Sequence, residues 1–125
     1  MSEIVYKELS YKLVGLAYEV YNSLGHSLKE KIYCDAYEEL LKQEGITYVR
    51  EFYFPLKIRG KTVAKGFFDY LVEGKIVLEF KVGGDKYIDA YRQIFDYIKS
   101  SDLKLGLIIR FTKDGVKVKR LANLY

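Results

Sequence analysis

The chain has 125 residues, half of them hydrophobic, a formal net charge of +4 and a pI near 9.0. This size and composition fit one compact domain, so we expect a single domain over residues 1–125. The charged segment MSEIVYKELSYKL lacks the apolar stretch of a signal peptide, and no apolar run is long enough to cross a bilayer. We therefore expect a soluble, cytoplasmic protein with no membrane partner.

The counts of cysteine and histidine exclude several kinds of site. Cys34 is the only cysteine, so there is no intramolecular disulfide, and no Cys/His spacing fits a zinc centre. We expect Cys34 to pack as a small hydrophobe. His26 is the only histidine, which argues against a Ser-His-Asp triad. We expect His26 to be solvated in a loop.

Positive charge gathers near the C-terminus. Residues 103–125 hold six basic side chains and one acid, a net +5, so the other 102 residues sum to −1. Such basicity permits nucleic-acid binding without requiring it. The segment KDGVKVKR could hold phosphates; alternatively, its lysines protect an exposed last strand from edge-to-edge aggregation.

Two helices are predicted first. Apolar residues recur every three or four positions over residues 6–24, and Gly25 is placed to end that helix in a left-handed conformation. Ser27 and Glu30 read as a capping box that starts a second helix, which stops at Gly45.

Strands dominate the rest of the chain. Runs rich in Tyr, Phe, Val and Ile predict an antiparallel meander of three strands near 46–58, 62–72 and 75–82, with Pro55 indicating an edge strand or a bulge. A third helix follows at about 87–100, then a buried strand at 103–111 and a final strand near 116–121. The order α-α-β-β-β-α-β-β predicts an α/β layer structure with a mixed central sheet.

Three charged residues interrupt the apolar stretch FFDYLVEGKIVLEFKV. Glu79 and Lys81 are two apart and share a strand face, and Asp69 lies opposite Glu79 if the intervening turn has three residues, or diagonal to it if the turn has two. Neighbouring carboxylates in a partly buried place repel, so they need a cation or a shared proton.

Two interpretations of this trio remain open. A divalent metal with oxygen ligands would neutralise the carboxylates, and Lys81 could orient or help deprotonate an attacking water, which is the chemistry of phosphodiester hydrolysis. Alternatively, the trio is an exposed hairpin end with a Glu–Lys pair, because D-x(n)-E-x-K is a short and common pattern.

The chain resembles the PD-(D/E)XK nuclease superfamily and, within it, the GxxExxY protein family. The segments that carry the resemblance are LGHSLKEKIY at 24–33, GFFDYLVEGKIVLEFKV at 66–82, QIFDY at 93–97, and GLIIRF with KVKR at 106–111 and 117–120. It covers about residues 15–120 and implies a restriction-endonuclease-like three-layer core, with a mixed sheet flanked by helices.

The resemblance also implies a site. Asp69 and Glu79 would bind Mg²⁺, or Mn²⁺, with a further ligand from the backbone carbonyl of Phe80, while Lys81 assists the water. Glu30 matches the family's helix glutamate near the metal, although the capping box is an alternative role. Residues expected to support the site or contact nucleic acid are Gln93, Tyr97, Arg110, Lys117, Lys119 and Arg120. For Tyr97, packing is the alternative.

Two positions depart from the family pattern. Ser27 stands at the name-giving glycine, and Arg110 stands where the family often has Asn. Neither change touches the trio, so the resemblance implies a Mg²⁺-dependent nuclease acting on DNA. A homodimer would let so small a nuclease address both strands. The alternatives are a non-catalytic nucleic-acid-binding or protein-interaction module on the same fold, and a structural oligomer built through tyrosine-rich surfaces.

Overall fold

The computed structural model describes residues 6–84 and 87–123, and its elements follow the order predicted from the sequence. The helices and strands are α1 (Lys7–Leu24), α2 (Glu30–Gln43), β1 (Tyr48–Ile58), β2 (Lys61–Val72), β3 (Ile76–Val82), α3 (Ile88–Ser100), β4 (Leu105–Thr112) and β5 (Gly115–Ala122).

One five-stranded sheet holds the strands in the order β1-β2-β3-β4-β5. The first three strands are antiparallel neighbours, β4 runs parallel to β3, and β5 returns antiparallel to β4. The parallel step requires a crossover, and α3 provides it. The predicted mixed sheet is therefore confirmed.

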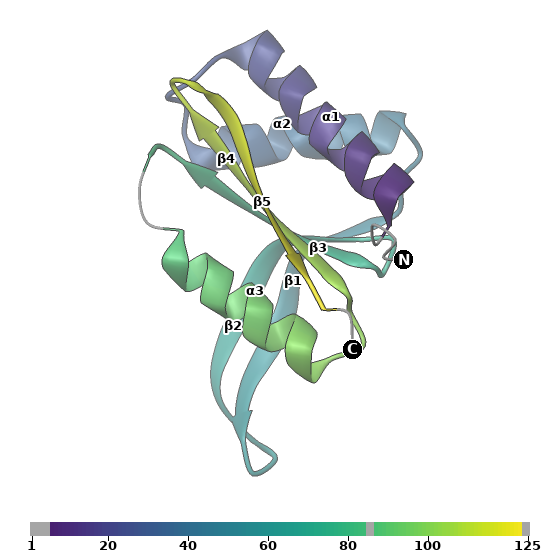
Figure 1. Ribbon diagram of the computed structural model, residues 1–125, viewed down its shortest axis with the longest axis vertical. Helices are drawn as coiled ribbons and strands as arrows, with labels where there is room; N and C mark the ends of the chain where they lie inside the picture. The colour runs from purple at the N-terminus through teal and green to yellow at the C-terminus, as the bar shows by residue number, and fades with distance from the viewer. Residues whose placement is uncertain (1–5, 85–86, 124–125) are drawn as a thin grey trace, which may run out of the picture.

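Helices cover both faces of the sheet, which gives the expected three layers (Figure 1). Helices α1 and α2 cover one face, where the apolar side of the β2–β3 hairpin is buried against them; its core residues include Tyr70, Leu78 and Phe80. Helix α3 packs on the other face, where Ile94 and Ile98 contact a second core around Val77. Cys34 is buried in the first core, as expected, and burial with nearby negative charge raises the pKa of its thiol well above the usual range.

The turn between β2 and β3 decides the register left open by the sequence. Glu73 and Gly74 both have positive φ, 54° and 63°, and the backbone N–H of Lys75 donates to the carbonyl of Val72 at 2.9 Å. Positive φ at both central residues is the type I′ geometry that suits a twisted hairpin. Val72 pairs with Ile76, so the turn has three residues.

The β1–β2 hairpin is long, and its far end extends away from the rest of the sheet (Figure 1). Glu51 has a φ of 54° and is skipped in the ladder between Arg50 and Phe52, so the ribbon bends there. Beyond the bend, Phe54 stacks on Phe68 at 4.1 Å between ring centroids. β1 is an edge strand, which confirms the first alternative drawn from Pro55. The ladder has a register shift directly after Leu56, where it skips Val63 of β2 rather than a residue of β1.

Two predicted helix ends are wrong in detail. Helix α2 begins at Glu30 with Lys29 as its N-cap and no side-chain cap, so the predicted Ser27–Glu30 capping box does not form. Ser27 has a φ of 68°, and its hydroxyl lies 2.6 Å from Nδ1 of the exposed His26 instead. Gly25 has the expected positive φ of 81°, but its ψ of −161° lies outside the left-handed helical region.

None of the helices in residues 6–84 and 87–123 combines the length and the apolar character that crossing a membrane needs.

Candidate active site

Asp69 and Glu79 meet where β2 and β3 separate. The last paired residues of this ladder are Tyr70 and Leu78, and one further step in the same register sets Asp69 opposite Glu79. At this position the carboxyl groups, rather than backbone carbonyls of the neighbouring strand, accept hydrogen bonds from the backbone. The N–H of Asp69 donates to Oε1 of Glu79 at 3.0 Å, and the N–H of Phe80 donates to Oδ2 of Asp69 at 2.7 Å. The two acids therefore converge, as the three-residue turn requires.

The surroundings of Glu79 disfavour its negative charge. Burial, followed by the charge of Asp69 and a hydrogen bond to the Asp69 carboxyl, raises the pKa of Glu79 to about 9, while Lys81 acts in the opposite direction. The direction of this shift means that the negative charge of Glu79 is disfavoured in the folded protein. A cation beside the two carboxyl groups would offset this cost and would be strongly favoured.

Lys81 follows Glu79 by two residues on β3 and lies on the same side of the strand. Its side chain is half-buried, and its charge lowers the pKa of both Glu79 and Glu30. The ammonium group is therefore electrostatically coupled to the acids rather than directed into distant solvent. In the parallel ladder, Lys81 pairs with Arg110 of β4.

Glu30 joins this group from the first turn of α2. Burial and then the charge of Asp69 raise the pKa of Glu30, and Lys81 lowers it. The charges of Asp69 and Lys81 therefore affect Glu30, although α2 and β2 are far apart in sequence. Since the capping box is absent, the capping role predicted for Glu30 is wrong.

The chemistry of these side chains fits a hard divalent cation. Carboxylate oxygens are the donors that Mg²⁺ prefers, and Mg²⁺ commonly keeps waters beside one or two carboxylates. Within residues 6–84 and 87–123, no cluster of three or more Asp, Glu, His or Cys side chains is already arranged to hold a metal ion. The fit is therefore to a two-carboxylate site, Asp69 and Glu79, with Glu30 nearby. The Phe80 ring is fully buried, and its N–H is already bound by Asp69.

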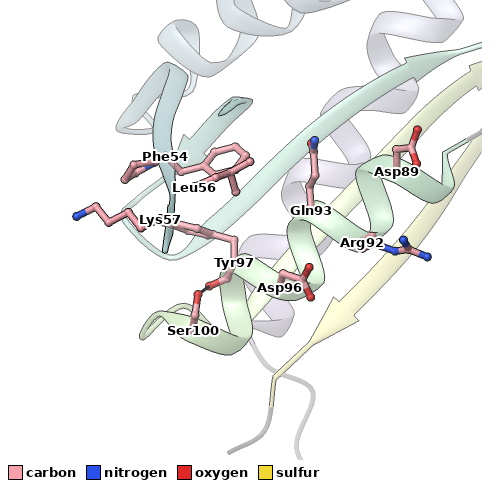
Figure 2. A pocket seen from close by; sticks show the side chains of 10 residues that line it. Phe54, Leu56, Lys57, Asp89, Arg92, Gln93, Asp96, Tyr97 and Ser100 are labelled. Atoms are coloured by element: carbon pink, nitrogen blue, oxygen red, sulfur yellow. Dashed lines mark hydrogen bonds between the residues drawn. The ribbon is translucent and has the colours of Figure 1, made fainter. Parts of the chain in front are cut away.

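Gln93 and Tyr97 lie on α3 and line a groove of about 660 Å³ between that helix and the end of β1. Figure 2 shows Tyr97 projecting toward the strand residues Phe54 and Lys57. The Tyr97 ring contacts Phe52, Phe54 and Phe68, so the packing role foreseen as an alternative is present. None of the residues lining this groove belongs to the Asp69–Glu79–Lys81 group.

The C-terminal cations do not form one patch. The guanidinium of Arg110 donates to the carbonyl of Gly84 at 3.1 Å and lies over the Tyr87 ring. Lys119 lies over the Tyr91 ring of α3, and Lys117, two residues earlier, has the same orientation on the strand. Arg120 points to the opposite face and donates to Oγ of Ser10 at 3.0 Å.

A second group of cations was overlooked in the sequence. Residues 52–68 contain Lys57, Arg59, Lys61 and Lys65 and no acid at all, and all four are exposed on the β1–β2 hairpin. The group was overlooked because charge was summed over the N-terminal 102 residues. In that sum, acidic residues of the helices cancel the charge of this basic run.

A mixed sheet between helical layers, with paired carboxyl groups and a lysine where two neighbouring strands separate, is a restriction-endonuclease-like fold. The chain belongs to the PD-(D/E)XK nuclease superfamily, whose sequence profile matches residues 7–121. Nucleases of this superfamily generally use divalent metal ions and act on nucleic acid.

Among solved structures, the chain is similar to one described as "Crystal structure of SSO0001", with a TM-score of 0.52 and 19% identity. The alignment covers 89% of this chain and 65% of that one. At this identity the likeness concerns the fold alone. The search of curated proteins found no match.

Proposed function

We propose that the protein is a Mg²⁺-dependent nuclease that hydrolyses phosphodiester bonds in DNA, with Mn²⁺ as a substitute metal. The observation that carries this proposal is the Asp69–Glu79 pair, in which burial and mutual charge raise the pKa of Glu79 to about 9. A buried acid pair costs stability in a metal-free protein, and such pairs are typical of sites that bind a cation.

Each residue has a distinct role in this proposal. Asp69 and Glu79 hold the metal, with the backbone carbonyl of Phe80 as a further ligand. When bound, the metal polarises the phosphate and lowers the pKa of a coordinated water. Lys81 orients that water and stabilises the charge that develops on phosphorus. Glu30, coupled to Asp69 and Lys81, completes the acidic side of the site.

The nucleic acid is held by groups around this centre. We assign Gln93, Tyr97, Arg110, Lys117 and Lys119 to contacts with the substrate or to support of the site, and Arg120 to a support role through its bond to Ser10. Residues 1–125 act as one domain, and two copies pair to address both strands. The GxxExxY branch is the proposed subfamily, supported by LGHSLKEKIY and QIFDY, with Ser27 in place of its first glycine.

The test is cleavage of single- and double-stranded DNA and RNA in Mg²⁺ or Mn²⁺ by the wild type, Glu79→Ala and Lys81→Ala. Metal-dependent cleavage that both substitutions abolish supports the proposal. Cleavage that survives both substitutions contradicts it, because it would come from another site or a contaminant.

The second candidate is a non-catalytic nucleic-acid-binding module on the same fold. The observation that favours it is that no ready cluster of three metal ligands occurs among the described residues. Salt-dependent binding of nucleic acid without cleavage in any divalent metal would support this candidate.

A further inference from the structure

We infer that the outer face of the β1–β2 hairpin binds an unpaired nucleic-acid strand, with bases on Tyr53 and Phe67 and a phosphate on Lys65. The inference deepens the proposed nuclease function and relies on it only for the idea that the bound strand continues into the Asp69 site.

The first observation is that the two faces of this hairpin differ. Phe54 and Phe68 are buried on the inner face and contact the Tyr97 ring of α3. Tyr53 pairs with Phe67 on the outer face, where their ring centroids are 5.6 Å apart. Tyr53 is 44% exposed and Phe67 is 56% exposed. The outer face therefore presents two neighbouring aromatic rings that no core requires.

The second observation is the charge on the same ribbon. Lys65 lies two residues before Phe67 on β2 and pairs with Pro55, so its side chain shares the outer face. The ladder skips Val63, so strand alternation does not extend to Lys61. Lys57, Arg59 and Lys61 add three charges near the tip, and no acid occurs from residue 52 to residue 68. None of the four cations forms an ion pair or a side-chain hydrogen bond with another residue of the described ranges 6–84 and 87–123.

These features together favour a polyanion as the occupant. A second copy of the chain docked hairpin to hairpin would bring four uncompensated cations against four others, which opposes such a dimer. Phosphates would neutralise the lysines, and bases would cover the rings. Rows of cations beside exposed aromatic rings are the usual combination in sites for unpaired strands.

The aromatic pair distinguishes an unpaired strand from a duplex. Bases inside a duplex are already stacked on one another, so their faces cannot reach a protein ring unless the strand is opened. Phe67 lies two residues before Asp69 on β2, a rise of about 7 Å along the strand. A strand stacked on Phe67 would therefore need only a short path to the acid pair.

The test is fluorescence anisotropy with labelled oligothymidylate of about 15 nucleotides and with a duplex of the same length. Measuring in EDTA separates binding from cleavage. Phe67→Ala and Tyr53→Ala should each raise the Kd for oligothymidylate about 5- to 100-fold. Phe67→Trp should retain binding. Tyr11, 82% exposed on α1, is the matched control, and Tyr11→Ala should change the Kd by less than about twofold.

The charge component has its own readout. For a single strand, replacing Lys65 by alanine should reduce the slope of log K against log salt by about 0.7, because this lysine contacts one phosphate. An unchanged slope would contradict the assignment of a phosphate to this side chain.

Three results would overturn the inference. They are absence of oligothymidylate binding by the wild type, wild-type affinity in both Phe67→Ala and Tyr53→Ala, or an equal loss of duplex binding in these variants. Binding that depends on the hairpin in a protein that never cleaves would retain the inference and remove the nuclease proposal. Cleavage of single strands that is unaffected by Phe67→Ala would retain the nuclease proposal and remove the inference.

Discussion

Asp69 and Glu79 are joined by an exchange of hydrogen bonds across the point where β2 and β3 part. Glu79 accepts from the backbone N–H of Asp69 at 3.0 Å, and Asp69 accepts from the backbone N–H of Phe80, the next residue after Glu79, at 2.7 Å. This arrangement satisfies backbone donors that would otherwise lose their ladder partners, and it also brings two carboxyl groups together. The pairing of β2 with β3 thus creates the acidic pair.

Glu79→Gln should reduce the loss of stability that the metal-free protein shows as the pH rises. The folded-state pKa of Glu79, about 9, lies above the ordinary value of 4.5, so between these values the unfolded state binds fewer protons than the native state. Stability then falls with rising pH, by up to about 1.4 kcal/mol per pH unit. Urea denaturation in EDTA between pH 5 and pH 8 should show this loss in the wild type and a smaller loss in Glu79→Gln. Equal pH dependence in both proteins would contradict the raised pKa.

Lys81→Ala should lower the rate of phosphodiester cleavage by about 100- to 1,000-fold, because it removes a charge placed beside the reacting phosphate. Since Lys81 is only half-buried, the midpoint of urea denaturation should change little. Lys104→Ala, at an exposed position just before β4, is the matched control and should leave the rate unchanged. Cleavage at the wild-type rate in Lys81→Ala would exclude the proposed role.

Glu30→Gln separates a role in catalysis from a role in the helix. Glu30 is the first residue of α2, so losing its charge should cost the helix only about 0.3–1 kcal/mol. If Glu30 supports the metal site, cleavage should fall at least about tenfold. Glu39→Gln, an exposed change on the same helix, should alter neither quantity. A cleavage rate unaffected by Glu30→Gln would assign Glu30 to helix stability alone.

Gly66→Ala should destabilise the base of the β1–β2 hairpin. A Cβ at this position would overlap the Phe54 ring, which stacks on Phe68. Displacing that ring should cost about 1–3 kcal/mol in the free energy of unfolding, measured in urea. Gly15→Ala on α1 is the control, and its effect on the free energy of unfolding should have the opposite sign. The added Cβ would meet no atom within 4 Å. Ala at that helical position should stabilise by about 0.5–1 kcal/mol.

The sequence predicted the element order and the mixed sheet because periodicity reports which side chains are buried. It also placed Asp69 opposite Glu79, provided that the turn had three residues, and the positive φ values of Glu73 and Gly74 supply that turn. The capping box was wrong because a Ser-x-x-Glu pattern does not say where a helix starts. Lys29 takes the N-cap, and Ser27 adopts a positive φ.

Two features of the surface depended on tertiary packing and could not be predicted from the sequence. Strand alternation alone does not show which face of the β1–β2 hairpin α3 covers, so the exposure of Phe67 beside Tyr53 was not foreseen. The division of the C-terminal cations also depends on β5 pairing at the sheet edge, which sends Arg120 toward Ser10 and Lys119 toward Tyr91.

The most direct test of the account is anomalous diffraction from crystals soaked in Mn²⁺. We predict one manganese peak beside the Asp69 and Glu79 carboxylates in the wild type and its loss in Asp69→Asn crystals. A Mn²⁺-saturated wild-type crystal in which Glu79 still accepts the Asp69 N–H and no peak lies beside either acid would contradict the proposed metal site.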